Sequence, residues 1–107
     1  MEKEQISGRK QIYGFAMITA EEISEIEQSG RTWILDLREK ESFEEGHLPH
    51  AIHAPYEQME YWKRHIPEYG NVILYCEHGN LSLLAARKLR GRKGNIYTLR
   101  GGYQSYR

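Results

Sequence analysis

Residues 71–90 constrain the fold more than any other part of the chain. They open with an unbroken apolar run at 72–75, which leads directly into Cys76, the single cysteine of the sequence. An apolar run of this length between turn residues is typical of a strand that is covered on both faces. After a short polar loop, apolar residues return at helical spacing, at Leu81, Leu84, Ala85 and Leu89. The pattern predicts a strand, a loop and a helix, with a thiol where the strand ends.

The position of Cys76 indicates chemistry. A lone cysteine is usually a small buried apolar residue. A loop that leads directly into a helix, however, presents free backbone N–H groups and the positive end of the helix dipole. An anionic sulfur at Cys76 would be stabilised by both, which is the environment of a reactive thiol.

Shorter patterns predict the other elements of an α/β domain. Four further apolar segments are expected strands: 13–18, 32–37, 51–55 and 95–99. Helices are expected from residue 20, where Thr19 and Glu22 form a capping box, and at 39–45 and 56–66. The alternation favours a central, mostly parallel sheet of about five short strands, flanked by helices on both faces. Because parallel strands end at a common edge, Asp36 and Cys76 are expected to share one rim.

Composition limits the size, the compartment and the partners. The 107 residues suffice for one core, and we expect a single domain at 11–107 after a polar lead-in at 1–10. Fifteen basic and fifteen acidic residues cancel, so no overall charge attracts nucleic acid or a membrane surface. No apolar run approaches the ~20 residues of a membrane helix, and the charged start has no apolar segment behind it. Together with the single cysteine, these features predict a cytoplasmic protein.

Four motifs, at residues 36–38, 43–51, 76–82 and 99–103, follow one another in an order that resembles the rhodanese (sulfurtransferase) family. Residues 76–82, Cys-Glu-His-Gly-Asn-Leu-Ser, resemble the family's active-site loop. Residues 36–38 resemble its D-x-R motif, 43–51 its F-x-x-G-H-I-P-G-A motif, and 99–103 its closing L-x-G-G-[FY] motif. Four ordered matches are more specific than any one of them alone. The resemblance implies a single-domain rhodanese-like fold in which the loop wraps around the sulfur.

The same resemblance implies a sulfurtransferase without a metal or an organic cofactor. Cys76 would take a sulfane sulfur from thiosulfate or a persulfide donor, hold it as a persulfide, and pass it to a thiol or cyanide. The loop would bind the donor and the persulfide through Glu77, His78, Gly79, Asn80, Leu81 and Ser82. Asp36, Arg38 and His47 would support the rim. The implied partners are a small-molecule sulfur donor and a thiol acceptor, and a partner protein is left open.

The loop departs from the family pattern in ways that affect its substrate. Many relatives carry arginine where Leu81 stands, and Glu77 repels anions, so weak activity with dianionic thiosulfate is expected. Phosphatase relatives of the fold use a longer loop with an arginine six positions after the cysteine, where this chain has Ser82. Phosphate hydrolysis is therefore not expected. A non-catalytic module that senses persulfide or binds a partner protein through the same cleft stays open as the alternative.

Other charged residues admit structural interpretations. Arg38 could instead pair with Glu41 or Glu45. Histidines recur every third residue at 47, 50 and 53, but an intervening proline breaks any helix that would align them, so no metal site is predicted. The basic cluster at 87–93 complements the dipole at the end of a helix, and no nucleic-acid site is predicted there.

Overall fold

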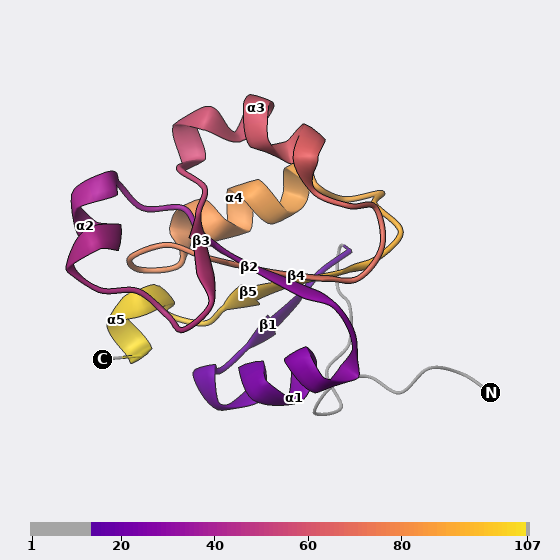
Figure 1. Ribbon diagram of the computed structural model, residues 1–107, viewed down its shortest axis with the longest axis horizontal. Coiled ribbons are helices and arrows are strands. Elements are labelled where there is room, and N and C mark those ends of the chain that lie inside the picture. The colour runs from indigo at the N-terminus through magenta and orange to yellow at the C-terminus, as the bar shows by residue number, and fades with distance from the viewer. Residues whose placement is uncertain (1–13, 107) are drawn as a thin grey trace.

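The computed structural model describes residues 14–106, so the expected lead-in at 1–10 lies outside the described residues. Five parallel strands form one sheet in the order β1-β5-β4-β2-β3 (Figure 1). The strands are β1 (Ala16–Ile18), β2 (Thr32–Asp36), β3 (Ala51–His53), β4 (Asn71–Tyr75) and β5 (Asn95–Leu99). The predicted α/β class with a parallel central sheet is confirmed.

Helices cover both faces of this sheet, as predicted (Figure 1). The α-helices are α1 (Ile23–Ser29), α2 (Lys40–Glu45), α3 (Met59–Trp62), α4 (Asn80–Lys88) and α5 (Gly102–Tyr106). Short 3₁₀ turns precede or follow two of them: η2 (Ala20–Glu22), η3 (Tyr56–Gln58) and η4 (Lys63–His65). Helix α1 lies on one face of the sheet, and α3 and α4 lie on the other. Within residues 14–106, no helix is long and apolar enough to cross a membrane.

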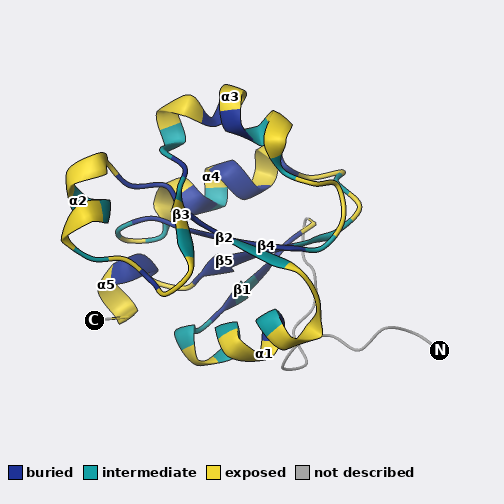
Figure 2. Cartoon of the chain, in the orientation of Figure 1, coloured by how far each residue is buried: buried dark blue, intermediate teal, exposed yellow. Residues whose placement is uncertain are grey.

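The central strand β4 separates two apolar layers. All of its residues are buried, because β2 and β5 flank it and helices cover both of its faces. Val72 and Leu74 pack in the layer beneath α3 and α4, whereas Ile73 and Tyr75 pack in the layer that contains Ile26 of α1. Figure 2 shows this burial along the sheet and on the inner faces of the helices. Burial on both faces explains the continuous apolar run in the sequence.

Two helical segments differ from the prediction. Residues 56–66, expected as one helix, form the three short turns η3, α3 and η4, although Met59 and Trp62 are buried as an apolar stripe. The Trp62 indole N–H donates to the Pro55 carbonyl at 2.8 Å and holds these turns against the end of β3. Helix α5 had no predicted counterpart, because five residues that begin with glycine carry no helical pattern.

Candidate active site

Cys76 lies directly after β4, where the strand leads into the loop before α4. Its side chain is buried, with 3% of the residue exposed. Two backbone N–H groups point at the sulfur, those of Gly79 at 3.2 Å and Ser82 at 3.4 Å from Sγ. Such convergent N–H groups form a concave site that suits an anion. The geometry can therefore hold a thiolate, or a persulfide that carries a negative charge.

Gly79 and Ser82 also give the loop its shape. Gly79 has φ +106°, a left-handed conformation that glycine adopts without steric cost, and it is the N-cap of α4. The hydroxyl of Ser82 donates to the Gly79 carbonyl at 3.1 Å, and Ser82 is fully buried. The loop is thus closed on itself around the sulfur, and the nine-residue helix α4 starts at its end.

Helix α5 packs against the other side of the loop. The backbone N–H of Tyr103 donates to the Cys76 carbonyl at 2.8 Å, and that of Gln104 donates to the Glu77 carbonyl at 3.0 Å. Gly102 makes this approach possible, because a Cβ there would lie 2.5 Å from both carbonyl oxygens. None of these α5 residues was in the predicted site. The closing motif at 99–103 was a signal for Gly102 and Tyr103, but it does not include Gln104.

Asp36 and Arg38 form a buried ion pair beside the loop. Nε and Nη2 of Arg38 donate to the Asp36 carboxylate at 3.0 and 2.8 Å. The Tyr75 hydroxyl donates to the same carboxylate at 2.6 Å and accepts from the Leu48 N–H at 3.0 Å. Burial, and then the hydrogen bond to Asp36, raise the pKa of Tyr75. Burial lowers the pKa of Arg38, but the hydrogen bond and charge of Asp36, and the hydrogen bond to Glu77, outweigh it and raise the pKa overall. Arg38 therefore stays charged and Tyr75 stays neutral near neutral pH.

Arg38 connects this pair to three other segments. Its Nη1 donates to Glu77 in the loop at 3.2 Å, and its Nη2 donates to the Gly46 carbonyl after α2 at 2.6 Å. Its guanidinium lies 4.1 Å from the centre of the Tyr103 ring in α5. The ion pairs of Arg38 are with Asp36 and Glu77 rather than with the acidic residues of α2.

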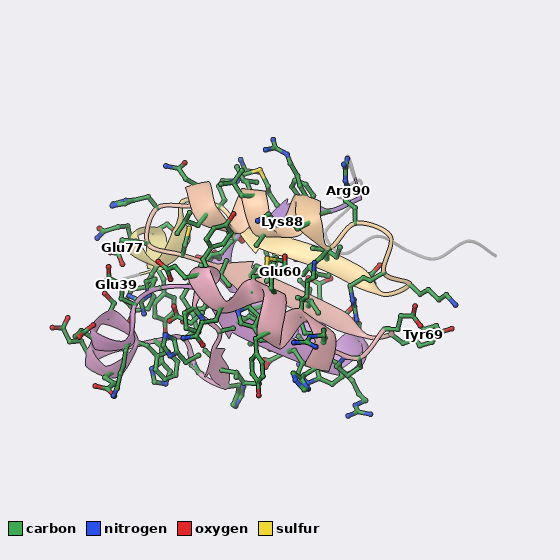
Figure 3. All side chains as sticks on the ribbon, turned by 90° about the horizontal axis from the view of Figure 1, so that it is seen from above. Glu39, Glu60, Tyr69, Glu77, Lys88 and Arg90 are labelled. Carbon is green, nitrogen blue, oxygen red and sulfur yellow. The ribbon has the colours of Figure 1, made fainter. Side chains whose placement is uncertain are left out.

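Two side chains donate hydrogen bonds to Glu77, whose negative charge was expected to repel anions. Its carboxylate accepts from Arg38 on one oxygen, at 3.2 Å, and from the Gln104 side chain on the other, at 2.6 Å. Figure 3 shows Glu77 at the end of the molecule where α5 lies, on the same side as Glu39. The two donors partly offset the negative charge, so the repulsion expected from Glu77 is weakened.

The other predicted site residues divide into two groups. His78, Asn80 and Leu81 are exposed on the loop and the first turn of α4, with Leu81 37% exposed. His47 is exposed as well, but its ring stacks on Phe43 at 3.8 Å and its Nδ1 lies 2.6 Å from the Phe43 carbonyl oxygen. The structure thus places His47 on the segment after α2, where its neighbour Gly46, and not His47, contacts Arg38.

The three regularly spaced histidines have separate hydrogen-bond or ion-pair partners, although the rings of His47 and His53 both stack on Phe43. His50 pairs with Glu27 at 2.9 Å, and His53 lies 2.8 Å from the Arg38 carbonyl oxygen, while His47 bonds the Phe43 carbonyl. Between residues 14 and 106, no three His, Cys, Asp or Glu side chains are grouped so that they could hold a metal ion.

A small polar cleft opens beside the loop. Its volume is about 160 Å³, and it is lined by Arg38, Ser42, Glu45, Gly46, Glu77 and Tyr103. A larger hollow of about 450 Å³ lies between η2 and α5 and is lined by Thr19, Ala20, Glu21, Arg100, Ser105 and Tyr106. The smaller cleft includes the loop residue Glu77, and the lining of neither hollow includes Cys76.

Known proteins with similar sequences include sulfurtransferases. The family model for the rhodanese-like domain matches residues 19–107. A tRNA sulfurtransferase from Desulfurococcus amylolyticus is 41% identical over 88 residues, which are 82% of this chain but only 17% of that protein. Thiosulfate sulfurtransferase GlpE from Coxiella burnetii is 30% identical over 76 residues, covering 69% of this chain and 70% of GlpE.

Solved structures agree with the sequence relatives. The crystal structure of a rhodanese-related protein from Thermoplasma volcanium has a TM-score of 0.74 and 26% identity, and the match covers 84% of this chain and 88% of that one. A rhodanese homolog from Thermus thermophilus has a TM-score of 0.65 and 27% identity, over 83% and 98% of the two chains. The chain therefore belongs to the rhodanese-like domain family of sulfurtransferases.

Proposed function

We propose that this chain transfers a sulfane sulfur through a persulfide on Cys76. The observation that carries the proposal is the pair of N–H groups, from Gly79 and Ser82, directed at the buried sulfur. In the first step the Cys76 thiolate attacks the outer sulfur of the donor. With thiosulfate, the bond between the two sulfur atoms breaks, sulfite leaves with its electron pair, and the Cys76 persulfide anion remains.

The second step returns the free thiolate. A thiolate acceptor, or cyanide, attacks the terminal sulfur of the persulfide and forms a new persulfide or thiocyanate. The bond between the two sulfur atoms breaks, and the electron pair returns to Cys76. The loop N–H groups act in both steps because negative charge stays on sulfur throughout, and one well-aimed donor of this kind contributes a few kcal/mol, on the order of 3, to a barrier.

We propose a persulfide, on a small molecule or a protein, as the donor that suits this loop best. Leu81 places an apolar side chain on the exposed first turn of α4 and supplies no cation for a dianion. The partial pairing of Glu77 leaves Leu81 as the main reason to expect weak thiosulfate activity. The relatives' names, tRNA sulfurtransferase and thiosulfate sulfurtransferase, support the sulfur-transfer class, and only the second of them includes thiosulfate.

A reducing compartment suits this chemistry. The chain has a single cysteine, so it has no internal disulfide to form, and the thiol has to be free to react. We therefore propose a cytoplasmic setting, with a thiol as the acceptor and a partner protein as one way to deliver it.

Intact-mass spectrometry tests the proposal. Wild type and Cys76→Ala are incubated briefly with thiosulfate or an organic persulfide, and a thiol acceptor is then added. We expect the wild type to gain one sulfur atom and to lose it to the thiol, and Cys76→Ala to gain none. Equal labelling of Cys76→Ala would contradict the proposal.

The non-catalytic alternative differs in turnover. A module that only senses persulfide or binds a partner would acquire sulfur once and keep it, or would acquire none. Thiocyanate formation from cyanide, measured over several equivalents of enzyme, separates the two functions. We expect multiple turnovers, and a single equivalent would favour the sensing module.

A further inference from the structure

We propose that Arg38, Glu77 and Gln104 form a clamp that holds the Cys76 loop in its sulfur-binding geometry. Glu77 and Gln104 would then be positioning residues of the reaction, since they act through the loop and do not touch the sulfur. The inference rests on the proposed sulfur transfer. We call these three residues the clamp.

The clamp joins segments that are distant in the sequence. Glu77 accepts from the Arg38 Nη1 at 3.2 Å across 39 positions, and from the Gln104 Nε2 at 2.6 Å across 27 positions. Gln104 holds Glu77 a second time, because its backbone N–H donates to the Glu77 carbonyl at 3.0 Å. Glu77 is therefore held by its side chain and its main chain together.

One end of the clamp is rigid. Arg38 is 7% exposed, and its Nε and Nη2 groups are bonded to Asp36 and to the Gly46 carbonyl. The ring of Tyr103 covers the guanidinium. The Glu77 side chain is 32% exposed and Gln104 lies on the surface, so these two ends are the ones that substitution can change without opening the core.

Glu77 links the clamp to the sulfur site, because it is next to Cys76 in the sequence. Glu77 follows the nucleophile directly, and Gly79, whose N–H bonds the sulfur, is two residues further on. A shift of Glu77 would therefore move the N–H groups that hold the sulfur. Misplacement of reacting groups by about 1 Å is known to cost up to roughly 100-fold in rate. Both Glu77 and Gln104 are thus expected to affect the rate without contacting the donor.

Four variants separate this positioning role from a simple charge effect. Glu77→Ala removes both side-chain contacts together with one negative charge, and Gln104→Glu places two carboxylates against each other. Glu77→Gln keeps a hydrogen-bonding group but loses the charge. The double variant E77Q/Q104E exchanges donor and acceptor, so both hydrogen bonds can form again and the total charge equals that of the wild type.

The rate of Cys76 loading is measured in a single turnover with two donors that differ by one charge. Thiosulfate is a dianion, and methanethiosulfonate is a monoanion that releases methanesulfinate. We expect Glu77→Ala and Gln104→Glu to load about tenfold more slowly with both donors. Glu77→Gln should lose less than about threefold, and the double variant should recover to within about threefold of wild type. As a matched control, Glu44→Gln removes a charge from the exposed surface of α2, outside the cleft and outside the clamp, and its rates should stay close to wild type.

Whether Glu77→Ala loads sulfur more slowly or faster than wild type distinguishes the positioning role from a charge effect. If Glu77 acts by charge alone, loss of its negative charge in Glu77→Ala should speed the loading of Cys76 from thiosulfate more than from methanethiosulfonate. Faster loading of Glu77→Ala, or a double variant as slow as Gln104→Glu, would overturn the clamp. Thermal melting of every variant shows whether the fold is retained.

Hydrogen exchange over residues 76–82 gives a readout that does not need sulfur transfer. The loop amides should exchange faster in Glu77→Ala and Gln104→Glu, and at the wild-type rate in the double variant. If wild type loads no sulfur but exchange follows this pattern, the proposed function fails and the clamp stands. If wild type loads sulfur and exchange is the same in all variants, the clamp fails and the proposed function stands.

Discussion

At the scale of single residues, the proposed reaction depends on the charge that two side chains, Glu77 and Leu81, would present to an anionic donor. Glu77 carries a negative charge, but Arg38 and Gln104 hold its carboxylate through two hydrogen bonds. Leu81 is uncharged and exposed on the first turn of α4. An added cation at Leu81 would therefore face a donor directly, whereas Glu77 is already engaged.

Substitution Leu81→Arg is expected to improve thiosulfate as a donor. A surface cation near a dianion contributes roughly 1 kcal/mol, so the kcat/KM for thiosulfate should rise about fivefold at low salt. The gain should shrink as salt is added, because exposed charges are screened. Steady-state rates at several salt concentrations measure it. Leu84→Arg, one turn further along the exposed face of α4, is the matched control, and an equal gain there would show that the effect is not specific to the loop.

At the scale of elements, the packing of α5 against the loop depends on Gly102. Its φ is +68°, and a Cβ would lie 2.5 Å from the carbonyl oxygens of Cys76 and Glu77. These two carbonyls accept the hydrogen bonds from the first turn of α5. No flexible side chain is available to move away, so α5 and the loop would have to separate.

Gly102→Ala is expected to lower the free energy of unfolding by about 3 kcal/mol or more, from backbone strain and lost contacts together. Sulfur loading of the folded fraction should fall by more than about tenfold, because the loop loses its support. Urea unfolding and single-turnover loading measure the two effects. Gly91→Ala is the control, since Gly91 also has a positive φ, +99°, but no atom lies within 4 Å of an added Cβ. A loss of stability no larger than that of Gly91→Ala would contradict the packing argument.

At the scale of the whole molecule, buried tyrosines make the fold sensitive to alkaline pH. Burial raises the pKa of Tyr75 and of Tyr97, reinforced by Asp36 for Tyr75 and by the charge of Glu25 for Tyr97. The unfolded chain releases these protons near pH 10, whereas the folded chain retains them. Their contribution to stability is therefore complete below about pH 10 and is lost as the pH rises further.

Urea unfolding between about pH 8 and pH 11 tests this dependence. Each tyrosine should add up to ~1.4 kcal/mol per pH unit to the loss of stability above pH 10. The free energy of unfolding of Tyr97→Phe should decline less steeply with pH than that of wild type. Subtracting the two curves removes the contribution of groups that titrate in both proteins. Parallel curves for the two proteins would mean that Tyr97 does not retain its proton in the fold.

Much of the architecture could be read from local patterns. The expected strands at 32–37 and 95–99 and the apolar run at 72–75 agree within about a residue with β2, β5 and β4. The predicted capping box also forms, and in it Glu22 accepts from the Thr19 backbone N–H at 2.8 Å. The segment at 56–66 was predicted less well, because its apolar spacing is satisfied equally by short turns that pack Met59 and Trp62 inward.

The sequence by itself determined the unit around Cys76: a strand buried on both faces, a glycine-containing loop and a helix that starts where the loop ends. Apolar periodicity and turn chemistry act between near neighbours, so they are visible in one dimension. Only the tertiary structure decided that Glu77 meets Arg38 and Gln104, and that α5 closes the loop. These contacts join residues 27 and 39 positions apart, and they exist because the parallel sheet brings the ends of β2, β4 and β5 to one edge.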